Sequence, residues 1–252
     1  MDSRPHLSVV VPVYNEERCI AENLRGVLEY LAAQPYTSEV IVVDDGSRDN
    51  TASLVEQIAA TAPSLRLIRN DHRGKAFAVR TGVLASAGEH VLFADADMAT
   101  PIHQTAKLLS ALEDGNQVAI GSREGYGARR YNEPWMRHFM GRVFNLVVRI
   151  LVMGQHRDTQ CGFKAFTRAA AQDIFHSVRL YGPSAPVLDA PLVTGFDVEL
   201  LYLAHLKDYR VVDLPVEWHY GPGSKVSPLR DSWRNFRDVL RVRYNAMRGL
   251  YG

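Results

Sequence analysis

The sequence is poor in cysteine and contains no long apolar run. Its 252 residues include two cysteines, Cys19 and Cys161, which form neither a disulfide framework nor the ligand spacing of a metal site. No segment reaches the roughly 18 consecutive apolar residues of a membrane-spanning helix. The first ten residues, MDSRPHLSVV, lack the apolar core of a signal peptide. We therefore expect a protein of a reducing compartment without a spanning segment.

Two common nucleotide-binding motifs are also missing, and the net charge is small. The chain has no G-x-G-x-x-G fingerprint and no P-loop. A formal charge of +1 provides no global attraction to nucleic acid. Residues 123–157 nevertheless hold seven arginines against two glutamates, and residues 225–252 hold seven basic against two acidic residues. Each segment has a net charge of +5, so the molecule is polarised.

The first half of the chain alternates short apolar runs with helical patterns. The expected strands cover residues 7–12, 39–43, 65–69, 91–93 and 117–120. The expected helices cover residues 19–33, 49–60, 76–87 and 102–113. This alternation predicts an α/β fold with a mostly parallel sheet flanked by helices. Right-handed crossovers then bring the loops at 12–17, 44–47 and 95–97 to one edge of the sheet.

Asp95 and Asp97 follow the apolar run at 91–93 directly. Alternation along an extended chain points both carboxylates to the same side, at the strand end where open α/β sheets bind ligands. Two close carboxylates repel each other unless a cation lies between them, and hard divalent cations favour such oxygen ligands. The pattern indicates a site for Mg²⁺ or Mn²⁺. The alternative is a solvated turn at the end of the strand.

The second half is less regular. Expected elements are a turn and strand at 158–167, a helix at 168–175, a loop at 181–191, a helix at 196–205, a strand at 211–216 and a glycine-rich loop at 219–225. Residues 136–153 form an apolar helical pattern with one narrow polar stripe. Nothing divides residues 1–226 into separate domains, and residues 227–252 form a terminal helix.

The terminal helical pattern at 229–251 is amphipathic. Its apolar residues fall on one narrow stripe: Leu229, Trp233, Phe236, Leu240, Tyr244, Met247 and Tyr251. Arginines line the flank of this stripe. Such a helix suits an anionic bilayer surface, and the similar pattern at 136–153 favours that interpretation. The alternatives are a helix that covers the protein's own core and a dimer contact.

Several motifs resemble family 2 glycosyltransferases, which are inverting enzymes of the GT-A fold. They are PVYNEE at 12–17, VVDDGSRDNT at 42–51, RGKAFAVRTG at 73–82, DADMAT at 95–100 and GSR at 121–123. DTQCGFKAFT at 158–167, FDVELLY at 196–202 and GSK at 223–225 narrow the resemblance to polyprenyl-phosphate sugar synthases. Within that group the motifs are most similar to dolichyl-phosphate β-glucosyltransferases, which use UDP-glucose. The mannose synthases, which use GDP-mannose, come second.

The resemblance implies a role for each matching residue. The nucleotide base and ribose would be held by Pro12, Tyr14, Glu16, Val43 and Asp45. The motif of Asp95, Ala96 and Asp97 would contact the nucleotide, and its two carboxylates would bind the metal. Phosphates of donor or acceptor would face Arg123 and Lys225.

Two departures from the family pattern bear on the donor and on membrane attachment. Ala99 stands where the mannose synthases carry a glutamine that reaches the metal, and the glucosyltransferase branch lacks that glutamine too. This favours UDP-glucose. The spanning N-terminal segment usual in that branch is missing from this sequence, which leaves attachment at the cytoplasmic face to the basic amphipathic helices.

The acceptor determines whether the reaction needs a general base. A lipid phosphate is mostly ionised near neutral pH and attacks unaided, so positioning by Arg123 and Arg137 would replace base catalysis. Lys225 would close over the diphosphate and stabilise the leaving group. Asp197 is the candidate base if the acceptor is a hydroxyl, although an acid at a helix start also serves the helix dipole. For Asp158 a turn role is favoured over catalysis.

Other functions remain open at this level. A glycosyltransferase acting on a soluble or polysaccharide hydroxyl is a second enzyme hypothesis. A catalytically silent nucleotide-sugar-binding regulator is the non-enzyme hypothesis, against which the intact aspartate pair and Lys225 argue. A nucleotidyltransferase would need a glycine- and lysine-rich triphosphate loop near the first strand, and the sequence has none there. The sequence does not determine the oligomeric state.

Overall fold

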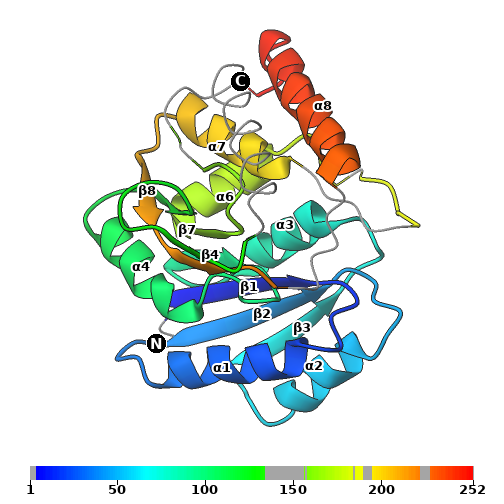
Figure 1. Cartoon of the computed structure of the whole chain (residues 1–252), viewed down its shortest axis with the longest axis vertical. Coiled ribbons are helices and arrows are strands. Elements are labelled where there is room, and N and C mark those ends of the chain that lie inside the picture. Colours follow the sequence, from blue (N-terminus) through cyan, green and yellow to red (C-terminus); the bar gives the residue numbers. More distant parts are fainter. Residues whose placement is uncertain are drawn as a thin grey trace.

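The computed structural model is a three-layer α/β arrangement (Figure 1). It describes residues 4–133, 156, 158–183, 185–189, 195–221 and 228–251. The strands are β1 (Leu7–Val13), β2 (Ser38–Asp44), β3 (Leu65–Arg69), β4 (His90–Ala94), β5 (Val118–Ser122), β6 (Arg129–Tyr131), β7 (Phe163–Thr167), β8 (Val211–Pro215) and β9 (Glu217–His219). The helices are α1 (Ile20–Ala32), α2 (Thr51–Ala59), α3 (Lys75–Ala85), the short 3₁₀ helix η1 (Ile102–Gln104), α4 (Thr105–Glu113), α6 (Arg168–Ser177), α7 (Phe196–Leu206) and α8 (Pro228–Met247).

The main sheet has seven strands in the order β3-β2-β1-β4-β7-β5-β8. All neighbouring strands in it are parallel except β7, which runs antiparallel between β4 and β5. The prediction of a mostly parallel sheet is confirmed. The chain also forms a small parallel sheet of β6 and β9, which the sequence analysis did not predict. Three-residue strands carry too few side chains for a recognisable alternation.

Helices cover both faces of the sheet because its central strands are apolar on both faces. All seven residues of β1 are buried. Alternate residues of that strand enter two different cores. One core contains buried residues of α1, α2 and α4, and the other contains buried residues of α3, α6 and α7. Figure 1 shows α1 and α2 below the sheet and α3, α6 and α7 above it.

One edge of the sheet collects the functional loops. The carboxyl ends of β1, β2, β4 and β5 lie at this edge because the four strands run in the same direction. The antiparallel β7 begins there, with Phe163 opposite Ala94. The antiparallel insertion therefore brings residues 158–162 to the same edge as residues 95–97. We call this edge the rim.

The terminal helix α8 has two different faces. Val239 and Val242 are fully buried, and Asp238 is 1% exposed. The Asp238 carboxylate accepts hydrogen bonds from the Tyr181 hydroxyl (2.7 Å) and from Gly195 N (3.1 Å), which fix α8 against the body of the protein. Burial and the Asp238 carboxylate raise the pKa of Tyr181 far above its ordinary value.

The other face of α8 is apolar and open. Its exposed side chains are Trp233 (68%), Leu240 (45%), Tyr244 (53%) and Met247 (70%). The helix therefore covers the protein's own core with one face and presents most of the predicted apolar stripe with another. Of the helices in the described part of the chain, none is long and apolar enough to cross a bilayer.

The prediction that Tyr251 belongs to the apolar stripe is wrong. It is 8% exposed, and its hydroxyl donates a hydrogen bond to Glu199 Oε1 at 2.6 Å. The physical reason is that α8 ends at Met247 and the chain then turns back through Gly249, whose φ of 65° suits glycine. The second predicted amphipathic helix, at 136–153, lies outside the described residues.

Candidate functional site

Asp95 and Asp97 leave β4 at the rim and meet Lys75, the first residue of α3. Lys75 Nζ forms an ion pair with Asp95 Oδ1. Burial alone would lower the pKa of Lys75, but the carboxylates of Asp95 and Asp197 outweigh it and raise that pKa above its ordinary value. Lys75 is therefore a permanent cation facing the aspartate pair.

The turn that presents the two carboxylates is held from a neighbouring helix. Asn23 of α1 donates a hydrogen bond through Nδ2 to the carbonyl oxygen of Ala96 at 2.8 Å. Met98 has a φ of 48° and donates from its backbone N to the Asp95 carbonyl oxygen at 3.0 Å. These contacts fix the direction in which Asp95 and Asp97 point.

Negative charge at this pair exceeds what Lys75 compensates. The Asp97 side chain reaches solvent, and its Oδ1 accepts a hydrogen bond from Ala99 N at 3.0 Å. Loss of hydration by the neighbouring protein atoms is the larger cause that raises the pKa of Asp97 above its ordinary value, and the Asp95 carboxylate raises it further. A second cation between the carboxylates would relieve this repulsion, so the donor set fits a hard divalent metal ion.

The Asp95 carboxylate can occupy its position because residue 162 is a glycine. Gly162 lies just before β7, and a Cβ added to it would overlap all three carboxylate atoms of Asp95. Only a residue without a side chain fits between β7 and Asp95 in this arrangement.

Substituting Gly162 with alanine is therefore expected to displace the Asp95 carboxylate and lower kcat/KM by about 100-fold, the cost of a misplacement of roughly 1 Å at a reacting centre. Steady-state kinetics measures this effect. Gly26→Ala is the matched control, because a Cβ on Gly26 in α1 meets nothing within 4 Å. Equal activity of the two variants would show that Gly162 does not position Asp95.

The two loops predicted to hold a nucleoside are joined to each other. Pro12 and Val43 are register partners on β1 and β2. Asn15 N donates to Ser47 Oγ at 2.9 Å, and Glu16 N donates to Thr51 Oγ1 at 2.8 Å. Residues 12–16 and 43–51 therefore form a single wall of the rim.

Asp45 is the most constrained carboxylate of that wall. It is 2% exposed and accepts hydrogen bonds from Arg73 N (2.9 Å) and Gly74 N (2.8 Å), with His72 Nδ1 at 2.7 Å. Burial raises the pKa of Asp45 above its ordinary value, and these hydrogen bonds oppose the rise. The Tyr14 ring stacks on the His72 ring with centroids 3.9 Å apart. Tyr14 and Asp45, both predicted nucleoside contacts, are thus linked through His72.

Arg123 is held by Asp158. Its Nε and Nη2 donate to the two carboxylate oxygens at 2.7 and 2.9 Å, and its backbone N donates to Oδ2 at 2.9 Å. Burial alone would raise the pKa of the fully buried Asp158, but the Arg123 guanidinium outweighs burial and lowers it far below its ordinary value. The guanidinium also lies over the Trp218 ring, 5.4 Å from its centroid. Arg123 therefore sits at the rim in a fixed orientation.

Asp197 pairs with a lysine that the sequence analysis did not single out. Lys164 is fully buried, and its Nζ donates to Asp197 Oδ1 at 2.5 Å and to the Cys161 carbonyl oxygen. Asp197, in the first turn of α7, is 5% exposed. Its carboxylate also raises the pKa of Lys75. Asp197 therefore belongs to a cluster of alternating charges that ends at Asp95.

Most of the predicted site residues meet at the rim. Those that the structure describes there are Pro12, Tyr14, Glu16, Val43, Asp45, Asp95, Ala96, Asp97, Arg123 and Asp197. Arg137 and Lys225 lie outside the described residues, so their predicted phosphate contacts stay predictions.

Four residues of the site carried no predicted role: Lys75, Lys164, His72 and Gly162. Lys75 and Lys164 stand in motifs that supported the family resemblance, so their positions were visible, but a lysine in a motif does not reveal its partner. Lys164 in particular lies in a strand whose neighbours are apolar, where a buried charge needs a partner from elsewhere in the chain.

The family model described as "Glycosyl transferase family 2" matches residues 8–175, which include the rim loops around Tyr14, Asp45, Asp95, Arg123 and Asp158. The chain belongs to this family. This match confirms the family that the sequence motifs predicted. The α/β architecture of the chain agrees with the expected GT-A fold.

Relatives of this family 2 glycosyltransferase match over nearly its whole length. It is 36% identical over 266 residues to the dolichyl-phosphate beta-glucosyltransferase of Homo sapiens, covering 97% of this chain and 77% of that protein. It is 34% identical over 275 residues to the enzyme of the same name from Saccharomyces cerevisiae, covering 99% and 78%. The narrower resemblance to dolichyl-phosphate β-glucosyltransferases is confirmed.

A solved structure supports the fold of the enzyme. The mannosyltransferase PcManGT from Pyrobaculum calidifontis, in complex with GDP-Man and Mn²⁺, aligns with a TM-score of 0.60 at 25% identity. The alignment covers 98% of this chain and 65% of that one. The protein is a glycosyltransferase with the fold that its sequence predicted.

Proposed function

We propose that this glycosyltransferase moves glucose from UDP-glucose to a dolichyl-type polyprenyl phosphate, with inversion, at the cytoplasmic face of a membrane. Similarity to dolichyl-phosphate β-glucosyltransferases over nearly the entire chain supports the sugar and the lipid. The structural observation that carries the proposal is the pairing of carboxylates with cations around Asp95 and Asp97.

Three carboxylates at the rim are held by cations. Asp95 pairs with Lys75, Asp158 with Arg123, and Asp197 with Lys164. A hydroxyl acceptor needs a base that takes its proton, and each of these three carboxylates is already engaged with a cation. An ionised phosphate needs no such base. The charge arrangement therefore favours an acceptor that brings its own negative charge.

The nucleoside would lie against the wall formed by residues 12–16 and 43–51. In this assignment Pro12, Tyr14, Glu16, Val43 and Asp45 bind the base and ribose. The stack of Tyr14 on His72 and the amide hydrogen bonds to Asp45 support it, because they fix the two side chains before the donor arrives.

Asp95 and Asp97 would hold a divalent metal ion, Mg²⁺ or Mn²⁺, next to the donor diphosphate. When bound, such an ion acts as a Lewis acid that stabilises the leaving nucleotide. Lys75 supplies a fixed positive charge on the same side. Arg123, and in the assignment by family motif Arg137 and Lys225, would orient the phosphates.

The exposed face of α8 supports attachment to an anionic membrane surface. An aromatic and aliphatic stripe lies next to arginines whose stems snorkel at such surfaces; Arg237, Arg241 and Arg248 are exposed. Figure 1 shows the first turns of α8 on the side of the molecule toward which β1 and β2 point. The start of α8 therefore lies on the same side of the molecule as the rim.

A donor screen tests the proposal. Purified protein, Mg²⁺ or Mn²⁺ and dolichyl phosphate in detergent are incubated with radiolabelled UDP-glucose, and the label is extracted into organic solvent. We expect labelled lipid with UDP-glucose and much less with GDP-mannose. Transfer only from GDP-mannose would assign the enzyme to mannose synthesis, and label that stays in the aqueous phase on a sugar hydroxyl would contradict the lipid acceptor.

The membrane contact makes its own prediction, for which α8 and α7 offer a matched pair. Leu240 on α8 and Leu206 at the end of α7 are both 45% exposed. Leu240→Ser is expected to weaken binding to anionic vesicles about tenfold, because a buried leucine contributes roughly 1.5 kcal/mol or more. Leu206→Ser leaves binding unchanged. Vesicle flotation measures both, and an equal loss in the two variants would contradict the role of α8.

A further inference from the structure

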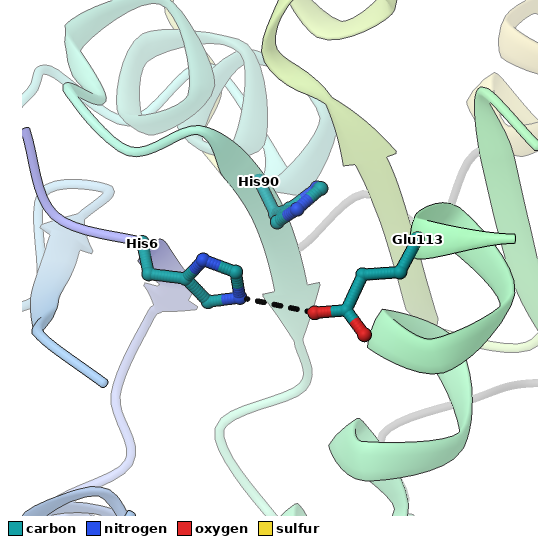
Figure 2. A group of neighbouring side chains, drawn as sticks. All are labelled: His6, His90 and Glu113. Atoms are coloured by element: carbon teal, nitrogen blue, oxygen red, sulfur yellow. Dashed lines mark ion pairs between the residues drawn. The ribbon is translucent and has the colours of Figure 1, made fainter. Parts of the chain in front are cut away.

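His6, His90 and Glu113 form a cluster at the edge of the sheet opposite the rim. His6 precedes β1, His90 begins β4, and Glu113 ends α4. Each residue contributes one possible ligand atom, and these three atoms all lie within 4.8 Å of one another. Figure 2 shows the His6 ring and the Glu113 carboxylate facing each other, with His90 beside them. The three residues come from three separate segments of the chain and lie around one shared space.

The geometry suits a transition-metal ion. His6 Nε2 lies 3.5 Å from Glu113 Oε1, close to the separation of two ligands on one tetrahedral ion. The His6 and His90 ring centroids are 4.9 Å apart and nearly perpendicular, at 73°. Two imidazoles and one carboxylate are a ligand set that Zn²⁺ uses, with a fourth position for water. His6 and His90 are half-buried and Glu113 is exposed, which provides access.

The surroundings contain two features of a metal site. The other ring nitrogen of His6, Nδ1, lies 3.5 Å from the Glu89 carboxylate, which resembles the carboxylate–histidine–metal arrangement that orients ligand imidazoles. His90 Nδ1 is buried and has no hydrogen-bond partner in the part of the chain that the structure describes. A buried imidazole nitrogen without a partner costs free energy that a ligand would recover.

We propose that His6, His90 and Glu113 bind one Zn²⁺ ion at a site separate from the divalent-metal site proposed at Asp95 and Asp97. The ion ties the start of β1 and the start of β4 to the end of α4. It thereby stabilises the edge of the sheet that faces away from the reaction, and its ligand set of two nitrogens distinguishes it from the all-oxygen pair of Asp95 and Asp97.

Calorimetry with ZnCl₂ tests the site on the chain of residues 1–252, treated with chelator and carrying no affinity tag. The Asp95→Asn/Asp97→Asn double variant removes the donor-metal carboxylates and serves as the starting protein. We expect it to bind one Zn²⁺ per chain. Adding His90→Gln removes a ligand and weakens zinc binding at least about 100-fold. Adding Glu89→Gln instead removes only the carboxylate next to the ligand His6, and it weakens zinc binding about tenfold.

The control and the second readout keep the test decisive. His205→Gln changes an exposed histidine on α7 and leaves zinc binding intact. Zinc raises the Tm of the starting protein, and this shift disappears with His90→Gln or, if that variant folds poorly, with His6→Gln. Unchanged zinc affinity in both histidine variants, or no binding by the starting protein, would overturn the proposal.

Discussion

Asp97→Asn is expected to lower kcat by about a thousandfold or more while the fold stays intact. The substitution removes one charge from the pair that would hold the divalent ion, and electrostatic stabilisation of a leaving group contributes factors of this size. The fold tolerates the substitution because the Asp97 side chain reaches solvent and because its negative charge is repelled by that of Asp95. Steady-state kinetics at saturating Mn²⁺ measures the loss.

Asp208→Asn is the matched control for that variant. Asp208 is exposed after α7 with a φ of 57°, a conformation that asparagine adopts readily, so neither activity nor Tm should change. Asp97→Asn itself should keep or slightly raise Tm, since it relieves repulsion. Full turnover of Asp97→Asn in the presence of chelator would exclude the carboxylate pair as a metal site.

Asp158→Asn is expected to lower the free energy of unfolding by about 3 kcal/mol, because it leaves the largely buried Arg123 charge without a counter-charge. The side chains are isosteric, so the loss reports charge and not packing. Chemical denaturation measures it. The double variant Arg123→Met/Asp158→Asn should recover part of the loss, since removing both charges costs less than removing one. A double variant less stable than Asp158→Asn would contradict this account.

The same pair predicts a pH dependence of defined sign. Arg123 lowers the pKa of Asp158 in the folded protein, so the pair stabilises the fold fully above the unfolded value of about 4. As the pH falls below about 4 toward the folded pKa, the unfolded state takes up the proton first and the stabilisation is lost. The stability difference between wild type and Asp158→Asn should therefore be constant from pH 7 to 5 and shrink below pH 4.

The pairing of charges explains why the sequence analysis assigned some side chains incompletely. Asp197 was a candidate base and Asp158 a turn residue, on the basis of their local positions. Their partners lie 33 and 35 residues away in sequence, at Lys164 and Arg123. A helix start or a turn motif carries no information about such a distant partner. The antiparallel insertion of β7 between β4 and β5 creates both contacts.

Tyr251 shows the same limit at the end of the chain. Its spacing placed it on the apolar stripe with Trp233, Leu240 and Met247. The backbone turn at Gly249 instead directs it onto Glu199, a buried acid of α7. Helical periodicity predicts a common face only as far as the helix continues, and it does not reveal where the last turn ends.

The sequence by itself determined the strand and helix pattern of the first half, the mostly parallel sheet, the family, and the meeting of three loops around Asp95 and Asp97. These follow from local hydrophobic periodicity and from the direction of parallel strands. The tertiary structure alone decided which cation faces each carboxylate, why Gly162 must lack a side chain, and that two histidines and a glutamate meet at the far edge. Such contacts depend on the packing of distant segments, because a side chain's charge is local while its partner is set by the fold.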